Sequence, residues 1–308
     1  MKNVGIIGTG KHGSRYASHI VKDISSLDLK AICRQSKEGE DQAREWGVKY
    51  HKEWKKLIHD KDVEAVISVV PPWLNLGIAQ ECSRVNKPLL IEKPLAVNGK
   101  QAKAIVSYME SCQLTVAQTL RFNPVIQSMK KSINDMGKIY SIHANQRLEP
   151  SSLAWHDKKE IAGAGVLIHT AVHIFDALHY ITGKKITRVM AASYKYHSKV
   201  LEDLVTLLFE MEDGIVGTVD ISKVGNGRSG GYEFVCEKGQ LCGDQVHGTL
   251  GKVIHNKKQP LKHFNATPTI SHLLEEWSEY IHGKSGNPIT GSDGLYAIQV
   301  CDACLQSA

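Results

Sequence analysis

Several features that would place a protein outside the ordinary globular class are missing from this sequence. Its 308 residues contain no apolar run near the roughly 20 residues that a membrane-spanning helix needs, so no membrane partner is expected. No leader pattern precedes the first predicted strand, and we therefore expect a cytoplasmic protein. The seven cysteines are odd in number and mostly far apart, which predicts free thiols rather than a disulfide framework.

The sequence also lacks a concentration of charge of one sign. The formal net charge is +6, and the basic doublets are scattered without aromatic residues among them. This pattern is typical of solvated surface, so no nucleic-acid partner is expected. A mild positive balance would suit an anionic cofactor or substrate.

The first motif along the sequence is a dinucleotide-binding pattern. A β-rich apolar run leads into Gly8, Gly10 and Gly13 in G-x-G-x-x-G spacing, and a helix is predicted to follow. The first glycine allows a tight turn, and the second lets backbone N–H groups approach a pyrophosphate. The third lets the helix sit close on the strand. Because the helix N-terminus adds N–H donors and a positive dipole end, this stretch predicts a phosphate-binding loop that also includes Thr9, Lys11 and His12.

Strands then alternate with helices through the first 120 residues. This rhythm predicts a doubly wound parallel sheet of the Rossmann type, with its strands near 29–33, 47–50, 65–70, 88–91 and 114–118. Beyond residue 120 strands dominate, and Asp213-Gly214 and Lys238-Gly239 are hairpin signals. We therefore predict a dinucleotide-binding domain over 1–120. An α+β domain with an open, mostly antiparallel sheet follows over 121–308, for substrate binding and oligomerisation.

The strand predicted from Leu204 to Met211 bears on assembly. In Leu204–Phe209 both alternating sets of side chains are largely apolar, so both faces of that strand should be covered. Helices cover only one face of such a sheet. We therefore expect a homodimer or homotetramer that packs through the sheet of the second domain.

Glu92-Lys93-Pro94 ends a predicted parallel strand. Open α/β sheets bind ligands at the carboxyl ends of their strands. A lysine there can donate to a substrate oxygen, or exchange protons if partial burial lowers its pKa. The alternative is an ordinary surface lysine at the end of a strand.

A long apolar stretch, residues 165–180, carries a second set of candidates. It is predicted to be one buried helix, and its polar residues fall on a single stripe at i, i+4, i+7 and i+11: His169, His173, Asp176 and Tyr180. Such a stripe must face a cleft or find internal partners. His173 is a candidate acid or base near neutral pH, and a histidine satisfied within the core is the alternative. His-x-x-x-His is also metal-ligand spacing, but the local pattern offers no third ligand, so no metal is predicted.

Taken together, these motifs resemble the Gfo/Idh/MocA oxidoreductases, the relatives of glucose-fructose oxidoreductase and inositol dehydrogenase. The likeness spans nearly the whole chain. Besides the glycine motif and Glu92-Lys93-Pro94, it rests on 120–124, on Trp155 with 161–165, and on the C-terminal stretch 287–308.

The resemblance implies a nicotinamide cofactor on the first domain and a substrate on the open sheet of the second. It implies that Lys93 and His173 act on the reacting oxygen. The cofactor-binding set it suggests is Gly8, Thr9, Gly10, Lys11, His12, Gly13, Arg34, Pro71, Asn75, Glu92 and Lys93. The substrate-binding set is Arg121, Trp155, His169 and Asp176.

Two positions depart from the pattern of the family. The dehydrogenases usually carry aspartate four residues before the catalytic histidine, and this chain has His169. They often carry histidine where this chain has Asn75. The first departure bears on the proton relay and on the substrate, and the second bears on a contact at the cofactor side.

The sequence therefore predicts an NAD(P)-dependent oxidoreductase. It would transfer a hydride between nicotinamide and a secondary alcohol or ketone of a sugar, polyol or sugar-derived substrate. Two alternatives stay open: a catalytically silent cofactor-binding regulator or scaffold on the same fold, and a reductase of a non-sugar carbonyl or imine.

Arg34 bears on the choice of cofactor. Sites that prefer NAD place an acidic residue at the end of the second strand, where it binds the adenosine ribose. Here Arg34 occupies that position, and Ser36 and Lys37 follow. Because a guanidinium can bind a 2′-phosphate bidentately, we predict a preference for NADP(H), with NAD(H) also possible. The alternative is a solvent-exposed arginine at a βα turn.

Overall fold

The chain forms two compact units. The computed structural model describes the backbone of residues 1–308 and every side chain except that of Ala154. Unit 1 comprises residues 1–119 and 268–295, and unit 2 comprises 120–267 and 296–308. The change of unit after residue 119 lies beside the boundary predicted at 120. The segment 268–295, which we had placed in the second domain, belongs instead to unit 1. Its helix α9 (Thr269–Ile281) packs on α1 (Gly13–Lys22), and Trp277 of α9 is fully buried.

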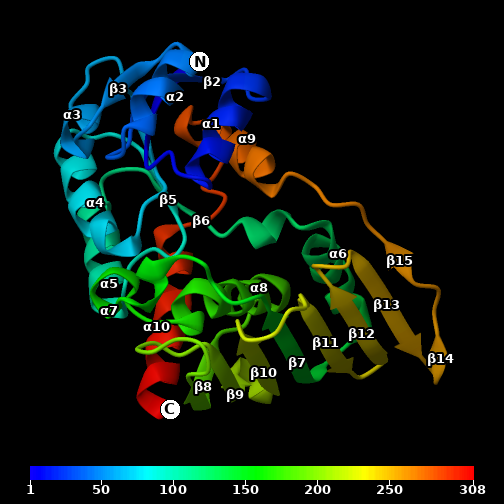
Figure 1. Ribbon diagram of the computed structural model, residues 1–308. Helices are drawn as coiled ribbons and strands as arrows, with labels where there is room; N and C mark the ends of the chain where they lie inside the picture. The colour runs from blue at the N-terminus through cyan, green and yellow to red at the C-terminus, as the bar shows by residue number, and fades with distance from the viewer. The chain divides into compact units, whose positions relative to one another are not determined.

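Unit 1 is built on a parallel sheet in the strand order β3-β2-β1-β4-β5-β6, the arrangement expected of a doubly wound fold. Its strands are β1 (Lys2–Ile7), β2 (Leu27–Cys33), β3 (Lys49–His51), β4 (Ala65–Ser68), β5 (Leu89–Glu92) and β6 (Leu114–Ala117). Figure 1 labels β2, β3, β5 and β6 of this sheet. The order reverses between β1 and β4, and ligands bind such sheets at the carboxyl ends of the strands beside this reversal. The predicted Rossmann fold is confirmed.

These strands are connected by the helices α1, α2 (Glu38–Trp46), α3 (Trp54–Ile58), α4 (Asn75–Arg84) and α5 (Gly99–Tyr108). Unit 1 also contains α9, which comes later in the chain. Local sequence explains several of their ends. Gly47 ends α2 in the left-handed conformation, with φ at 65°, and the Asn98 side chain accepts the N–H of Gln101 at the start of α5.

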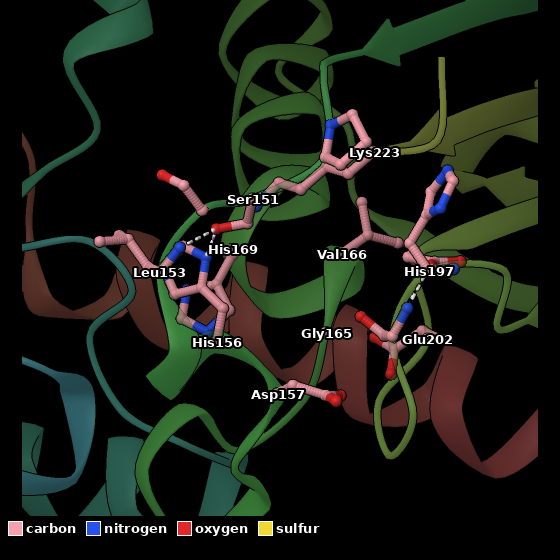
Figure 2. Close-up of a pocket in the computed structure, with 14 residues that line it drawn as sticks. Ser151, Leu153, His156, Asp157, Gly165, Val166, His169, His197, Glu202 and Lys223 are labelled. Carbon is pink, nitrogen blue, oxygen red and sulfur yellow. Dashed lines mark hydrogen bonds between the residues drawn. The ribbon is translucent and has the colours of Figure 1, made fainter. Parts of the chain in front are cut away.

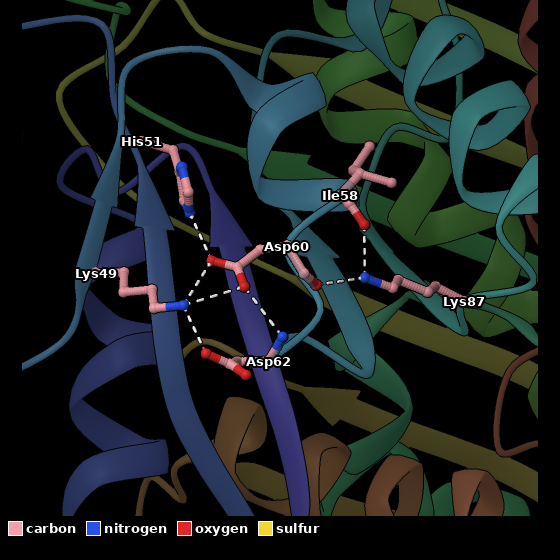
Figure 3. Close-up of polar contacts among 6 residues, drawn as sticks. All are labelled: Lys49, His51, Ile58, Asp60, Asp62 and Lys87. Atoms are coloured by element: carbon pink, nitrogen blue, oxygen red, sulfur yellow. Dashed lines mark hydrogen bonds and ion pairs between the residues drawn. The ribbon is translucent and has the colours of Figure 1, made fainter.

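A polar cluster fixes the edge of this sheet (Figure 3). The Asp60 carboxylate accepts from Lys49 Nζ at 3.2 Å and lies 3.0 Å from His51 Nε2, so it holds strand β3. Lys87 Nζ donates to the carbonyls of Ile58 and Asp60 at 2.6 and 2.8 Å. The cluster thereby ties β3, the turn after α3 and the segment after α4 together.

Unit 2 contains a mixed, mostly antiparallel sheet in the order β14-β13-β12-β11-β7-β10-β9-β8, with β15 paired to β13. Among the described strands of this second sheet, only β7 and β10 pair in parallel. The strands are β7 (Ile139–Arg147), β8 (Ile186–Tyr194), β9 (Leu204–Met211), β10 (Val216–Ser222), β11 (Gly231–Cys236), β12 (Gly239–Asp244), β13 (Thr249–Ile254), β14 (Lys257–Lys258) and β15 (Lys262–His263). Both predicted hairpins form: Asp213 and Gly214 take φ values of 61° and 74° between β9 and β10, and Gly239 follows the turn between β11 and β12.

Helices cover one face of this sheet. Helix α6 (Pro124–Ile133) packs on β12 and β13, and α8 (Val172–Thr182) packs on α6 and β7. The short α7 (Lys159–Ala162) precedes α8, and α10 (Gly291–Ser307) enters unit 2 at Tyr296. The opposite face carries exposed apolar side chains, among them Met190, Leu208 and Val216.

The helical stretch Lys159–Thr182 bears on the expectation that no segment of the chain is long and apolar enough to span a membrane. It is long enough to cross a membrane, and an 18-residue window within it has a mean hydropathy of 1.6. However, 83% of that window is buried inside the protein, as in the core helix of a globular unit.

Candidate functional site

The glycine loop of unit 1 has the geometry that a pyrophosphate requires. Gly8 has φ at +92°, and a Cβ there would lie 2.2 Å from the Val69 carbonyl oxygen. A Cβ on Gly13 would lie 1.9 Å from the Gly8 carbonyl oxygen, so these two glycines are fixed by close packing. A Cβ on Gly10 would meet nothing within 4 Å, so this glycine faces open space. Since α1 also has no side-chain cap at His12, its N-terminal N–H groups suit an anion.

Arg34, at the carboxyl end of β2, is tied to this loop. Its Nη1 donates to the Thr9 carbonyl at 3.0 Å, and its Nε donates to Ser36 Oγ at 2.7 Å. Gln42 Nε2 donates to the same carbonyl at 3.1 Å. The guanidinium therefore lies beside the phosphate loop, while Lys37 and Lys11 are exposed.

Glu38 is a neighbour of Arg34 that sequence reasoning missed. Its Oε2 lies 3.6 Å from Arg34 Nη2. A hydrogen bond from Ser36 lowers the pKa of Glu38, and Arg34 adds to that effect. The i, i+4 spacing of the two residues on a helix start was the available signal.

Glu92 is the last residue of β5, and Lys93 follows it. Tyr16 Oη donates to the Glu92 carboxylate, and His12 Nε2 lies 3.5 Å from it, so α1 holds this acid in place. Burial lowers the pKa of Lys93 and Glu92 partly opposes that effect. A lysine with a lowered pKa is suited to donating to, or exchanging a proton with, a bound oxygen.

Asn75 and Pro71 lie beyond β4. Pro71 precedes the short 3₁₀ turn Pro72–Leu74, at the carboxyl end of the strand. Asn75 is fully buried: its Oδ1 accepts from Ser68 Oγ at 3.0 Å, and its Nδ2 donates to the carbonyls of Pro94 and Leu95 at 3.3 and 3.2 Å. These contacts fix the segment that follows Lys93, a role the sequence did not suggest for Asn75.

In unit 2 the predicted helix 165–180 is interrupted by a π-helical turn, Leu167–Ala171. His169 lies in this turn, whereas His173, Asp176 and Tyr180 lie in α8. Because a π turn closes i→i+5 hydrogen bonds, it changes the phase of the helix, and the prediction of one regular helix with a continuous stripe is wrong. Single-turn π segments of this kind are frequent at functional sites.

His169 has aromatic neighbours. Its ring stacks on that of His156, with centroids 4.7 Å apart and planes inclined by 16°, and Trp155 meets it edge-on at 5.5 Å. Ser151 Oγ lies 2.7 Å from His156 Nδ1. The structure thus brings the predicted residues Trp155 and His169 together. It also places His156 in this group, a residue that sequence reasoning did not single out although it is next to Trp155.

Arg121 and Asp176 pair with each other. Arg121 donates to both carboxylate oxygens, with Nε to Oδ2 at 2.9 Å and Nη2 to Oδ1 at 2.6 Å, and the Asp176 side chain is buried. The guanidinium lies 5.3 Å from the Tyr180 ring centroid. This forked ion pair anchors α8, and therefore the half-buried His173 one turn earlier, to the segment that begins unit 2.

Comparison with known proteins decides the family. A model of the oxidoreductase family with an NAD-binding Rossmann fold matches residues 2–119, and a model of the GFO/IDH/MocA C-terminal domain matches residues 126–242. The chain belongs to the Gfo/Idh/MocA family of oxidoreductases.

Relatives of this oxidoreductase include dehydrogenases. Levoglucosan dehydrogenase of Pseudarthrobacter phenanthrenivorans is 24% identical over 295 residues, which cover 82% of this chain and 73% of the relative. Inositol 2-dehydrogenase 1 of Saccharopolyspora erythraea is 27% identical over 248 residues, covering 76% of this chain and 70% of the relative. The solved levoglucosan dehydrogenase in complex with NADH and levoglucosan has a TM-score of 0.89 at 22% identity. It covers 100% of this chain and 97% of that one, which confirms the fold.

Proposed function

We propose that this oxidoreductase interconverts a secondary alcohol and a ketone on a sugar, polyol or sugar derivative, in the cytoplasm. The proposal rests on two side chains, Lys93 and His173, whose chemistry suits the polarisation of an oxygen and the exchange of its proton. Lys93 has a lowered pKa at the carboxyl end of β5, and His173 lies in the first turn of the largely buried helix α8. Relatives that act on levoglucosan and inositol support the substrate class.

The residues of the chain divide the work. Backbone N–H groups of the loop 8–13 bind the pyrophosphate of the cofactor, whose nicotinamide, when bound, supplies the hydride chemistry. Lys93 polarises the substrate oxygen. His173 accepts the hydroxyl proton during oxidation and returns it during reduction.

Two groups act by positioning these residues. Asn75 holds the segment after Lys93 through the carbonyls of Pro94 and Leu95. Asp176, paired with Arg121, holds the helix of His173. In our proposal Arg121 and Asp176 therefore hold the helix of His173 in place, rather than binding substrate as the resemblance implied.

For the cofactor we propose NADP(H) in preference to NAD(H). The support is the position of the Arg34 guanidinium, which is held beside the phosphate loop by Thr9 and Ser36. A cation fixed there suits a 2′-phosphate. Glu38 limits the advantage because its negative charge lies near the same guanidinium.

The proposal is tested by turnover. Absorbance at 340 nm should reveal reduction of NADP⁺ with members of a panel of aldoses, anhydrosugars and polyols. Lys93→Ala and His173→Ala should each lower kcat by about 10²-fold or more, and His173→Ala should leave the Kd of the cofactor unchanged. His272→Ala, an exposed histidine on α9, is the matched control. Near-normal kcat in both variants would exclude the assignment. Cofactor binding without turnover of any panel member would favour the silent regulator.

A further inference from the structure

Unit 2 contains a cavity of about 180 Å³ against the π-helical turn (Figure 2). Imidazoles from three different segments line it, from the loop at 150–157, the turn itself and the segment 197–203. Lys223 adds a fourth basic side chain. The basic and hydroxyl-bearing lining residues are Ser151, Ser152, His156, His169, His197, Ser198 and Lys223.

The carboxylates of the cavity wall are occupied by backbone N–H groups. Asp203 accepts three such bonds, at 2.6 to 2.9 Å, from residues 196–198, and Asp157 accepts three, at 2.8 to 3.0 Å, from residues 199–201. Glu202 accepts the N–H of Leu167 at 3.1 Å, while its carbonyl accepts that of Val166. These acids therefore build the wall of the cavity, and their oxygens are engaged by backbone donors.

The imidazoles of His156 and His169 are held rigidly. Their rings stack, Trp155 packs edge-on against both, and Ser151 bonds to His156. The close approach of Gly165 to Glu202 fixes the turn behind them, because a Cβ at Gly165 would lie 1.9 Å from the Glu202 carbonyl oxygen. The donors that face the cavity are thus preorganised, which lowers the ordering cost of binding a polar group.

Such a wall suits a negative group. Imidazoles change charge near neutral pH, and an anion next to them favours their protonated form. Lysine and serine side chains supply further donors. The volume exceeds the ~10–15 Å³ that one water needs by about tenfold, so a carboxylate or a phosphate can enter.

We propose that this cavity binds the acidic group of an anionic sugar, so that the substrate carries a carboxylate or a phosphate. The inference rests on the proposed function, since it names the substrate class of that oxidoreductase. His169 and His156 are the residues that select the charge.

Calorimetric titration into the wild-type protein saturated with NADP⁺ tests the proposal. The ligands are gluco, galacto and manno hexoses, each as the neutral sugar, the uronate and the 6-phosphate. We expect at least one charged form to bind at least tenfold more tightly than its neutral counterpart. Which of the two charged forms does so identifies the acidic group. Neutral sugars that bind as tightly as both charged forms, or no binding of any charged form, would overturn the proposal.

Variants separate charge selection from folding. His169→Asp should remove the preference for the charged sugar, and the near-isosteric His169→Asn should weaken it at least fivefold without adding a negative charge. His263→Asp, on exposed β15, makes the same change of charge away from the cavity and should leave the preference intact. An unchanged preference in both His169 variants would refute the assignment. Turnover of neutral sugars alone would refute this inference and leave the proposed function standing. Tight binding of the acidic sugars without hydride transfer would support this inference and refute the proposed function.

Discussion

The guanidinium of Arg34 has three polar neighbours that bear on cofactor choice. It donates to the Thr9 carbonyl and the Ser36 hydroxyl, and it lies 3.6 Å from the Glu38 carboxylate. The first two contacts hold the cation in place, and the third competes with a phosphate for it. In our proposal, cofactor preference therefore depends on the balance of charges at the end of β2.

Arg34→Asp should weaken binding of NADP⁺ by a few kcal/mol, because it removes a charge-assisted contact and adds repulsion. Glu38→Gln should act in the opposite direction by removing a like charge from the phosphate site. Calorimetric titration of NADP⁺ and NAD⁺ into each variant measures both effects. Arg44→Asp, an exposed arginine on α2, is the control. Tighter binding of NAD⁺ than of NADP⁺ by the wild-type protein would contradict the proposed preference.

At the scale of secondary-structure elements, the cluster around Asp60 determines how β3 is held. Burial alone would raise the pKa of Asp60, but the N–H of Asp62 and the side chains of His51 and Lys49 hold that pKa below its ordinary value. A carboxyl group with a lowered pKa in the folded state stabilises the fold above its unfolded pKa of about 3.9, and loses that effect as the pH falls through the folded value.

Asp60→Asn should therefore lower the free energy of unfolding by about 1–3 kcal/mol at pH 7. The difference from wild type should shrink below about pH 4. Urea denaturation at a series of pH values provides the measurement. The more exposed Asp62→Asn should have a smaller effect at pH 7. A difference that stays constant from pH 7 to pH 3 would show that the charge of Asp60 is not the cause.

The elements that the sequence predicted well are those set by local chemistry. The roles of Gly8, Gly10 and Gly13 follow from spacing alone, and the structure places each as expected. The π-helical turn could not be predicted, because nothing in an apolar run distinguishes i→i+5 from i→i+4 hydrogen bonding. That 268–295 belongs to unit 1 was also not predicted, because local sequence does not show it. This placement depends on the packing of α9 against α1, which is a tertiary contact.

The sequence identified residues of the candidate site better than it identified the partners that those residues contact. Arg121 and Asp176 were expected to bind substrate, but they form an ion pair with each other across a long stretch of sequence. Asn75 was expected to act at the cofactor side, and its buried amide holds the segment after Lys93. Such assignments need coordinates because a polar residue type does not specify its partner.

At the scale of the whole molecule, the open face of the unit 2 sheet is the surface we propose for assembly. Met190 pairs with Leu208 and Leu208 pairs with Thr218 across β8, β9 and β10, which places them in one row on this face. Met190, Leu208 and the nearby Val216 are 67%, 55% and 49% exposed in the single chain. Exposed apolar side chains gathered on one face of a sheet in this way are typical of an interface between copies.

Light scattering coupled to size-exclusion chromatography should show a dimer or tetramer at micromolar concentration. Leu208→Arg should shift it to monomer, because a charge would be buried in the interface. Tyr108→Arg, an exposed substitution on α5, should leave the mass unchanged. A monomeric wild-type protein would defeat the proposal.

The central claim is that Lys93 and His173 serve one substrate oxygen. A crystal structure of the wild-type enzyme with NADP⁺ and a turned-over substrate tests it most directly. The account predicts that the reacting oxygen lies about 2.6–3.2 Å from both Lys93 Nζ and a ring nitrogen of His173. A substrate whose reacting oxygen contacts neither side chain, or which binds away from them, would contradict it.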